Sequence, residues 1–260
     1  MSAESRRLDR DMVRRGLAPS RSRAAQHIAD GEVTVDGRTV RRASARVVPD
    51  QHITVQGGRA WVSRAAHKLV GALEACPQVD PEGRRCLDAG ASTGGFTEVL
   101  LSRGAGHITA VDVGHGQLVD ELRQDPRVEV HEGLNVRDLT AGRLGAPFDV
   151  VVADLSFISL RLVVGALAGQ CRDGTDLLLM VKPQFEVGRE RLGRTGVVTS
   201  PEQRAEAVAG VVDAAAAQGL GALSAHRSAL AGQDGNREFF LHLRAGSPVT
   251  VRLDTLDFGG

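Results

Sequence analysis

The sequence predicts an α/β protein in which a parallel sheet carries helices on both faces, preceded by a small α+β module. From residue 84 onward, five short apolar runs alternate with helical stretches, for example at 94–103, 159–169 and 201–218. Near-continuous apolar runs between helices are typical of parallel strands that are buried on both faces. Two later runs, at 222–230 and 237–243, predict a pair of strands that extends one edge of this sheet.

The charge distribution divides the chain into two parts. Its 260 residues carry 32 basic and 32 acidic side chains, a formal net charge of +0. Residues 1–62 hold twelve arginines and seven acids, a net charge of +5, whereas residues 63–260 hold 20 basic and 25 acidic residues, a net charge of −5. Such an imbalance indicates a basic module attached to a near-neutral one. We therefore predict two domains, residues 1–60 and 61–260.

Two short helices and a strand-rich end are predicted for the basic part. The apolar residues between Leu8 and Leu17 recur at helical spacing. Ser20 is a favourable N-cap for a second helix, which we expect to end at Gly31. Apolar residues then alternate with polar ones between residues 33 and 55, as in short antiparallel strands.

This part resembles the S-four (S4) RNA-binding domain over roughly residues 6–56. The similarity rests on Ser20-Arg21, followed in order by Gly31-x-Val33-x-Val35-x-Gly37. In that family the helical pair and its arginines face RNA phosphates, which implies RNA contacts for Arg14, Arg15, Arg21, Arg23, Arg41 and Arg42. A compact arginine-rich face binds a phosphate backbone through counterion release and bidentate contacts. For any single arginine, a solvated charged helix is an equally good explanation.

A glycine-rich turn follows the first predicted strand of the larger part. The strand ends at Asp88, and Gly90-Ala-Ser-Thr-Gly94-Gly95-Phe96 opens the next helix. Glycines at such a junction let the backbone approach a ligand closely, and the helix N-terminus favours a negative group. Three residues separate Gly90 from the glycine pair, which departs from the GxGxxG spacing of dinucleotide sites.

Polar residues after the next two predicted strands complete a nucleotide-type pocket. Asp112 ends the second strand, where a carboxylate can accept hydrogen bonds from a ribose diol. Asn135 and Asp138 follow the third strand in a position suited to an adenine edge, although Asp138 could instead cap a helix. Together these residues predict an adenosine-containing cofactor.

The runs DAGASTGGFTEVLL, AVDVG and VVADLSFISL resemble the Rossmann-type S-adenosylmethionine methyltransferases of the FtsJ-like class. The resemblance implies S-adenosylmethionine as the cofactor, with Asp154 beside the transferred methyl group and no metal ion. The absence of a basic residue from positions 88–97 suits a cofactor without a pyrophosphate. The implied cofactor-binding residues are Asp88, Gly90, Ser92, Thr93, Gly94, Gly95, Phe96, Asp112, Asn135 and Asp138.

Lysine usage singles out two further positions. Lys68 and Lys182 are the two lysines of the chain, and the other 30 basic residues are arginines. A lysine amine can lose its proton when it is buried or lies beside another cation, whereas a guanidinium stays protonated. Asp154 and Lys182 end neighbouring predicted strands, so they should meet at one sheet edge. Glu238 joins them if the last strand runs antiparallel, and Lys68 could close the group from the preceding helix.

The set Lys68, Asp154, Lys182 and Glu238 resembles the Lys-Asp-Lys-Glu tetrad of ribose 2′-O-methyltransferases. The resemblance implies that Lys182 accepts the proton of the ribose hydroxyl and that Asp154 holds Lys182 by a charged hydrogen bond. Lys68 would help to position the hydroxyl, and Glu238 would balance the added positive charge. One of five nearby phenylalanines could stack on a target base, although core packing is expected for most of them. These are Phe96, Phe157, Phe185, Phe239 and Phe240.

Over nearly its whole length, to about residue 244, the chain resembles the TlyA family, some members of which carry the older name hemolysin. The resemblance implies 2′-O-methylation of cytidine in the ribosomal RNA of the small (16S) and large (23S) subunits. A membrane-active cytolysin is disfavoured because an apolar span and an aromatic-anchored amphipathic helix are both missing. An NAD-binding oxidoreductase is disfavoured by the glycine spacing. We expect a cytoplasmic monomer that binds ribosomal RNA and no membrane.

Overall fold

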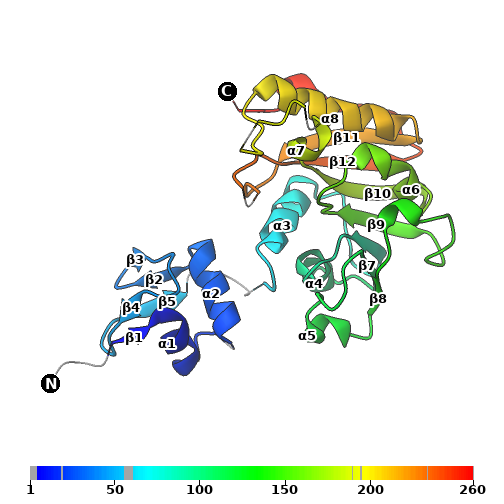
Figure 1. Ribbon diagram of the computed structural model, residues 1–260. Coiled ribbons are helices and arrows are strands. Elements are labelled where there is room, and N and C mark those ends of the chain that lie inside the picture. Colours follow the sequence, from blue (N-terminus) through cyan, green and yellow to red (C-terminus); the bar gives the residue numbers. More distant parts are fainter. Residues whose placement is uncertain are drawn as a thin grey trace. The chain divides into compact units, whose positions relative to one another are not determined.

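The computed structural model describes residues 5–18, 20–55, 61–188, 190–193, 195–232 and 234–259. The chain forms two compact units, Met1–Arg64 and Ala65–Gly260 (Figure 1). The predicted boundary at residue 60 lies outside the described residues. Within the described part of the chain, no helix is long and apolar enough to cross a membrane.

Helices α1 (Leu8–Arg14) and α2 (Arg21–Asp30) form the helical layer of the N-terminal unit. As predicted, the Ser20 hydroxyl caps α2 by accepting a hydrogen bond from the Arg23 backbone N–H, and Gly31 ends the helix in the left-handed region. Two small antiparallel sheets complete the unit. One pairs β1 (Arg6–Arg7) with β4 (Arg46–Val47), and the other has the order β3-β2-β5, from Arg38–Thr39, Val33–Val35 and Ile53–Val55.

The core of the N-terminal unit lies between the helices and the three-stranded sheet. Leu8 and Met12 of α1 pack with Ile28 of α2 and Val33 of β2, and all four are fully buried. The helical spacing of the apolar residues therefore creates the buried face of α1, and the polar residues between them remain available for other contacts.

A seven-stranded sheet forms the centre of the C-terminal unit, with the order β11-β12-β10-β9-β6-β7-β8 (Figure 1). The parallel strands are β6 (Arg85–Ala89), β7 (His107–Asp112), β8 (Val128–Glu132), β9 (Phe148–Ala153) and β10 (Cys171–Val181). Strand β12 (Phe239–Ala245) pairs antiparallel with both β10 and β11 (Leu220–Arg227). The two last strands thus extend one edge of the sheet, as the sequence predicts.

Helices cover both faces of this sheet, as predicted. On one face, side chains of α6 (Val164–Ala168) and α8 (Pro201–Ala216) share a hydrophobic cluster with Leu177, Leu179 and Val181 of β10. On the other face, α4 (Gly95–Ser102) and α3 (Ala65–Ala75) contact the alternate strand residues, such as Asp88 and Met180. Shorter segments are α5 (Asp120–Arg123), α7 (Pro183–Glu186), and the 3₁₀ turns η1 (Val136–Asp138), η2 (Leu160–Leu162) and η3 (Leu253–Thr255).

Candidate active site

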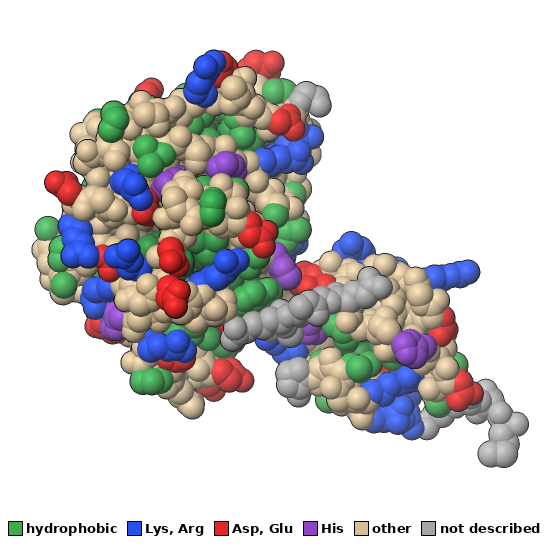
Figure 2. Space-filling view, turned by 180° about the vertical axis from the view of Figure 1, so that it is seen from behind, with side chains coloured by type: hydrophobic (Ala, Val, Ile, Leu, Met, Phe, Trp, Pro, Cys, Tyr) green, Lys and Arg blue, Asp and Glu red, His purple; other side chains and the backbone are tan. Residues whose placement is uncertain are grey.

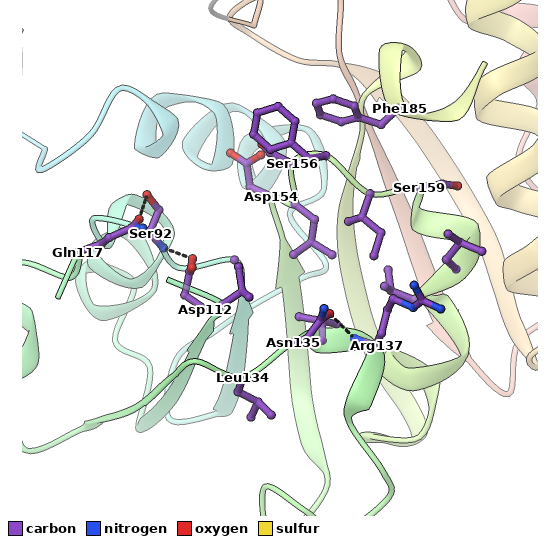
Figure 3. A pocket seen from close by; sticks show the side chains of 18 residues that line it. Ser92, Asp112, Gln117, Leu134, Asn135, Arg137, Asp154, Ser156, Ser159 and Phe185 are labelled. Atoms are coloured by element: carbon purple, nitrogen blue, oxygen red, sulfur yellow. Dashed lines mark hydrogen bonds between the residues drawn. The ribbon is translucent and has the colours of Figure 1, made fainter. Parts of the chain in front are cut away.

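A cavity of about 770 Å³ opens beyond the carboxyl ends of β6, β7, β8 and β9 (Figure 3). This is the edge at which parallel α/β sheets bind ligands, because the loops after the strands diverge there. Gly90 and Ser92 line the cavity from the loop after β6, Asp112 and Gln117 from the region after β7, and residues 134–137 from the loop after β8. Asp154, Ser156 and Phe157 line it from the loop after β9, with Phe185 from α7.

The glycine at the start of the cavity loop is required by close backbone packing. Gly90 has a φ of 90°, and a Cβ atom there would lie 2.8 Å from the backbone oxygen of Asp154. Any side chain would therefore force apart the loops after β6 and β9. Gly94, the N-cap of α4, has a φ of 100°, a backbone conformation that strains any residue with a side chain.

Backbone hydrogen bonds fix the orientation of the Asp112 carboxylate at the cavity wall. Its Oδ2 accepts from the Ser92 N–H at 2.8 Å, and its Oδ1 accepts from the Gly114 N–H at 2.7 Å. Each carboxylate oxygen has two acceptor sites, so Asp112 can accept further hydrogen bonds from a diol. The Ser92 hydroxyl also donates to Gln117 Oε1 at 3.2 Å, which connects the glycine loop to the segment after β7 (Figure 3).

Four of the ten predicted cofactor residues line the cavity, namely Gly90, Ser92, Asp112 and Asn135. The other six do not. Thr93 is exposed, Gly94 and Gly95 belong to the start of α4, and Phe96 is buried against the ring of Phe240, with centroids 6.2 Å apart. Asp138 is exposed at the end of η1, and the side chain that caps this turn is that of Asn135, which accepts from the Arg137 N–H at 3.0 Å.

Asp88 lies within the sheet and does not face the cavity. Its side chain is fully buried, its Oδ2 accepts a hydrogen bond from Thr97 Oγ1 at 2.7 Å, and its Oδ1 has no partner. Burial raises the pKa of this carboxyl to about 7, because the charged form is poorly solvated there. Asp88 therefore connects β6 to α4 beneath the glycine loop.

The four residues of the predicted tetrad occur as two buried ion pairs. Lys182 Nζ lies 2.6 Å from Asp154 Oδ1, and Lys68 Nζ lies 2.5 Å from Glu238 Oε2. The side chains of Lys68, Lys182 and Glu238 are each at most 10% exposed. Asp154 thus contacts Lys182 directly in an ion pair, and the catalytic role of this contact stays a prediction.

Strand register explains how these residues reach one edge. In the antiparallel pair of β10 and β12, Val181 faces Phe239, so the adjoining Lys182 and Glu238 lie at the same end of the two strands. Asp154 follows directly after β9, the parallel neighbour of β10 on its other side. Lys68 approaches from α3, where its Nζ also lies 3.9 Å from Met180 Sδ. The antiparallel direction of β12 is therefore what brings Glu238 to this edge.

Two of the five phenylalanines lie at the cavity, and the others belong to the core. Phe96, Phe239 and Phe240 are at most 3% exposed. Phe157 is 92% exposed with a φ of 64°, and its ring lies 5.4 Å from that of Phe185, centroid to centroid. An exposed aromatic residue in the left-handed region is unusual for a merely structural position. Both residues line the cavity, where Phe157 is exposed and Phe185 is half-buried.

Residues that the sequence analysis did not single out also line the cavity. Gln117, Arg137 and Leu162 are in loops or short turns, where neither hydrophobic period nor a motif indicates which side chain turns inward. Ser156 lies in the run VVADLSFISL, which does not by itself indicate a role for this serine. Its proximity to Asp154, two residues along the same loop, was the one available signal.

The six arginines of the N-terminal unit that are predicted to bind RNA differ in their exposure to solvent. Arg14, Arg21, Arg41 and Arg42 are exposed, and arginine side chains are visible on the surface of this unit (Figure 2). Arg15 contacts Asp11 and donates to the backbone oxygens of Gln51, Val48 and Pro49, so its donors are used within the unit. Arg23 is half-buried.

Two buried carboxylates on α1 form ion pairs with four arginine side chains of this unit. Asp9 contacts Arg7 and Arg21, and Asp11 contacts Arg14 and Arg15. The guanidinium of Arg7, which donates two hydrogen bonds, holds the pKa of Asp9 at about 2, and Arg21 adds to the effect. Both acids thus orient arginine side chains, of which those of Arg14 and Arg21 remain about half exposed.

We expect acid to loosen α1 through Asp9. In the folded protein the pKa of the Asp9 carboxyl is about 2, below its ordinary value of 3.8. The stabilisation by the ionised carboxylate is therefore present above pH 4 and is lost as the pH falls toward 2. Asp9→Asn should destabilise α1 by about 1–3 kcal/mol near neutral pH and should weaken this acid dependence. Hydrogen exchange of α1 peptides between pH 5 and 2 measures both effects. Asp50→Asn, at an exposed carboxylate, is the matched control; equal pH profiles for Asp9→Asn and the native chain would contradict the prediction.

Comparisons with known proteins bear on both units. Residues 61–245 match the FtsJ-like methyltransferase family, and residues 6–57 match the S4 domain. The chain is 51% identical over 244 residues to the 16S/23S rRNA (cytidine-2′-O)-methyltransferase TlyA of Mycobacterium tuberculosis, covering 93% of this chain and 91% of that protein. It is 32% identical over 237 residues to "Hemolysin A" of Brachyspira hyodysenteriae, covering 91% and 98% of the two chains. A solved "putative hemolysin" from Streptococcus thermophilus superposes with a TM-score of 0.75 at 32% identity, covering 99% of this chain and 94% of that one.

Proposed function

The chain belongs to the TlyA family, in which an S4 domain precedes an FtsJ-like methyltransferase domain, and we propose that it methylates the ribose 2′-hydroxyl of a cytidine in 16S or 23S ribosomal RNA. S-adenosylmethionine is the methyl donor. The observation that carries the proposal is the Lys182–Asp154 pair, 2.6 Å apart, because Asp154 also lines the cofactor cavity. The pair supports Lys182 as the candidate proton acceptor, because its partner Asp154 lines the cavity, and an NAD-binding oxidoreductase gives no reason for such a pair.

The cavity has the size and the donor set for this cofactor. Its volume of about 770 Å³ falls in the range of pre-formed small-molecule sites. Asp112 can accept from both hydroxyls of a ribose, Asn135 lies where an adenine edge can be read, and Gly90 admits the rest of the molecule close to the backbone. When bound, S-adenosylmethionine supplies an electrophilic methyl group on a sulfonium centre. Two cavity-lining carboxylates, Asp112 and Asp154, suit that positive charge.

Lys182 then removes the proton of the ribose hydroxyl. A general base of this kind contributes when it lies within hydrogen-bond reach of the proton and in line with the reacting atoms. Asp154 keeps the lysine at the end of β9 and β10 through their ion pair. Lys68 and Glu238 form a second, nearly neutral pair at the same strand end, where Lys68 helps to position the hydroxyl and Glu238 balances its charge.

The target base and the RNA backbone are contacted by separate surfaces in this proposal. The exposed ring of Phe157, supported by the half-buried ring of Phe185, can stack on a base that has been turned out of its helix. The exposed arginines of residues 1–60, which we treat as the RNA-binding domain, contact phosphates without reading sequence. Residues 61–260 form the catalytic domain. We propose that the protein is a monomer and that it acts in the cytoplasm, where ribosomal subunits are assembled.

A methyl-transfer assay tests the function directly. The native protein is incubated with labelled S-adenosylmethionine and, separately, with small subunits, large subunits and free ribosomal RNA. We expect label in the RNA, at a ribose that resists alkaline cleavage on its 3′ side and belongs to a cytidine. Binding of S-adenosylmethionine is measured in parallel by calorimetry. Cofactor binding without methylation of any RNA would refute the proposed substrate, and methylation of a base would refute the proposed position.

A further inference from the structure

Lys182 is not among the residues that line the cofactor cavity, but its two side-chain partners from the loop after β9 are. Its own side chain is 10% exposed and does not line the cavity, whereas Asp154 and Ser156 both do. A base that does not line the cavity can accept a proton there only if its lone pair points toward the cavity. The direction in which the amine points is therefore as important as its distance.

The two neighbours of Lys182 act on it in different ways. Asp154 Oδ1 lies 2.6 Å from Nζ and supplies the opposite charge of an ion pair. Ser156 Oγ lies 2.8 Å from Nζ and accepts a hydrogen bond from it. Among the described residues, Ser156 is the one to which the Lys182 amine donates a hydrogen bond.

We propose that Ser156 is the positioning residue of the proton acceptor, an inference that rests on the proposed function. A neutral amine has two N–H bonds and one lone pair in fixed tetrahedral directions. When Ser156 Oγ accepts a hydrogen bond from one N–H, rotation about the Cε–Nζ bond is restricted, and the direction of the lone pair is restricted with it.

The proton balance of this step is simple. The ribose hydroxyl gives its proton to the lone pair of Lys182 as the oxygen–methyl bond forms and the sulfur–methyl bond breaks. Lys182 becomes an ammonium ion, and Ser156 keeps its own proton throughout. Because Ser156 Oγ also accepts from the ammonium, it stabilises the charged product state of the base.

Single-turnover methylation by two variants at this position tests the inference. Ser156→Ala removes the acceptor oxygen, and Ser156→Thr keeps it. We expect Ser156→Ala to lower the rate constant by about tenfold, in the range of a misplaced general base, with less than a twofold change in the affinities for S-adenosylmethionine and RNA. We also expect the rising limb of its pH–rate profile to move to lower pH, because the ammonium loses one acceptor.

Ser156→Thr should recover most of the rate and the native pH profile. Ser102→Ala, at an exposed serine that ends α4, is the matched control and should behave as the native protein. A Ser156→Ala rate within twofold of native, or a loss of rate with an unmoved pH limb, would overturn the inference while leaving the proposed function intact. An inactive native protein would overturn both.

Discussion

Lys182→Arg is expected to abolish methyl transfer while S-adenosylmethionine still binds. A guanidinium keeps the positive charge that pairs with Asp154, but it stays protonated at any pH at which the protein is folded, so it cannot accept a proton. We expect the single-turnover rate to fall by about 10²- to 10⁴-fold, the usual contribution of a general base. The cofactor affinity, measured by calorimetry, should change little, because Lys182 does not line the cavity.

The reverse exchange at an exposed position that does not line the cavity is the control for this variant. Arg191→Lys replaces an exposed arginine, paired with Glu206 across 2.6 Å, by the smaller cation. Exposed ion pairs contribute about 0–1 kcal/mol, so this variant should be as active as the native protein. If Lys182→Arg kept more than a tenth of the native rate, Lys182 would be needed for its charge alone and another group would have to accept the proton.

The fold follows from local patterns, and most of it was predictable. Buried strands separated by amphipathic helices leave few alternatives to a covered parallel sheet. The side-chain contacts were harder to predict from the sequence, because a one-residue step along a strand turns a side chain to the other face. Asp88 shows this, since it lies at the expected strand end but turns toward Thr97 of α4.

The ion pair of Arg15 has a local signal in the sequence. Asp11 of α1 precedes Arg15, the C-cap of this helix, by four residues, a spacing that favours an ion pair. The more distant contacts of Arg15, to the backbone near Gln51, depend on the packing of the whole unit and had no local signal. Gln117 and Arg137 belong to this second group, because their loops are placed by tertiary contacts.

Glu238→Gln is expected to destabilise the C-terminal unit strongly. Lys68 Nζ is 2.5 Å from Glu238 Oε2, and both side chains are at most 8% exposed. Removing the carboxylate leaves the ammonium buried without its counter-charge, and removing one partner of a buried pair typically costs about 3–5 kcal/mol. Urea unfolding of the C-terminal unit measures the loss. A free energy of unfolding within about 1 kcal/mol of native would mean that water reaches Lys68 readily.

The double variant Lys68→Met/Glu238→Gln separates the structural and chemical roles of this pair. Two neutral side chains need no counter-charge, and replacing both partners of a buried ion pair is often neutral or stabilising, so most of the lost stability should return. Lys68→Met also places a thioether near the sulfur of Met180, which already lies 3.9 Å from Nζ. If Lys68 positions the ribose hydroxyl, the double variant is stable but nearly inactive. If it regains the native rate as well, the pair only holds α3 to β12, and Lys182 and Asp154 suffice for proton transfer.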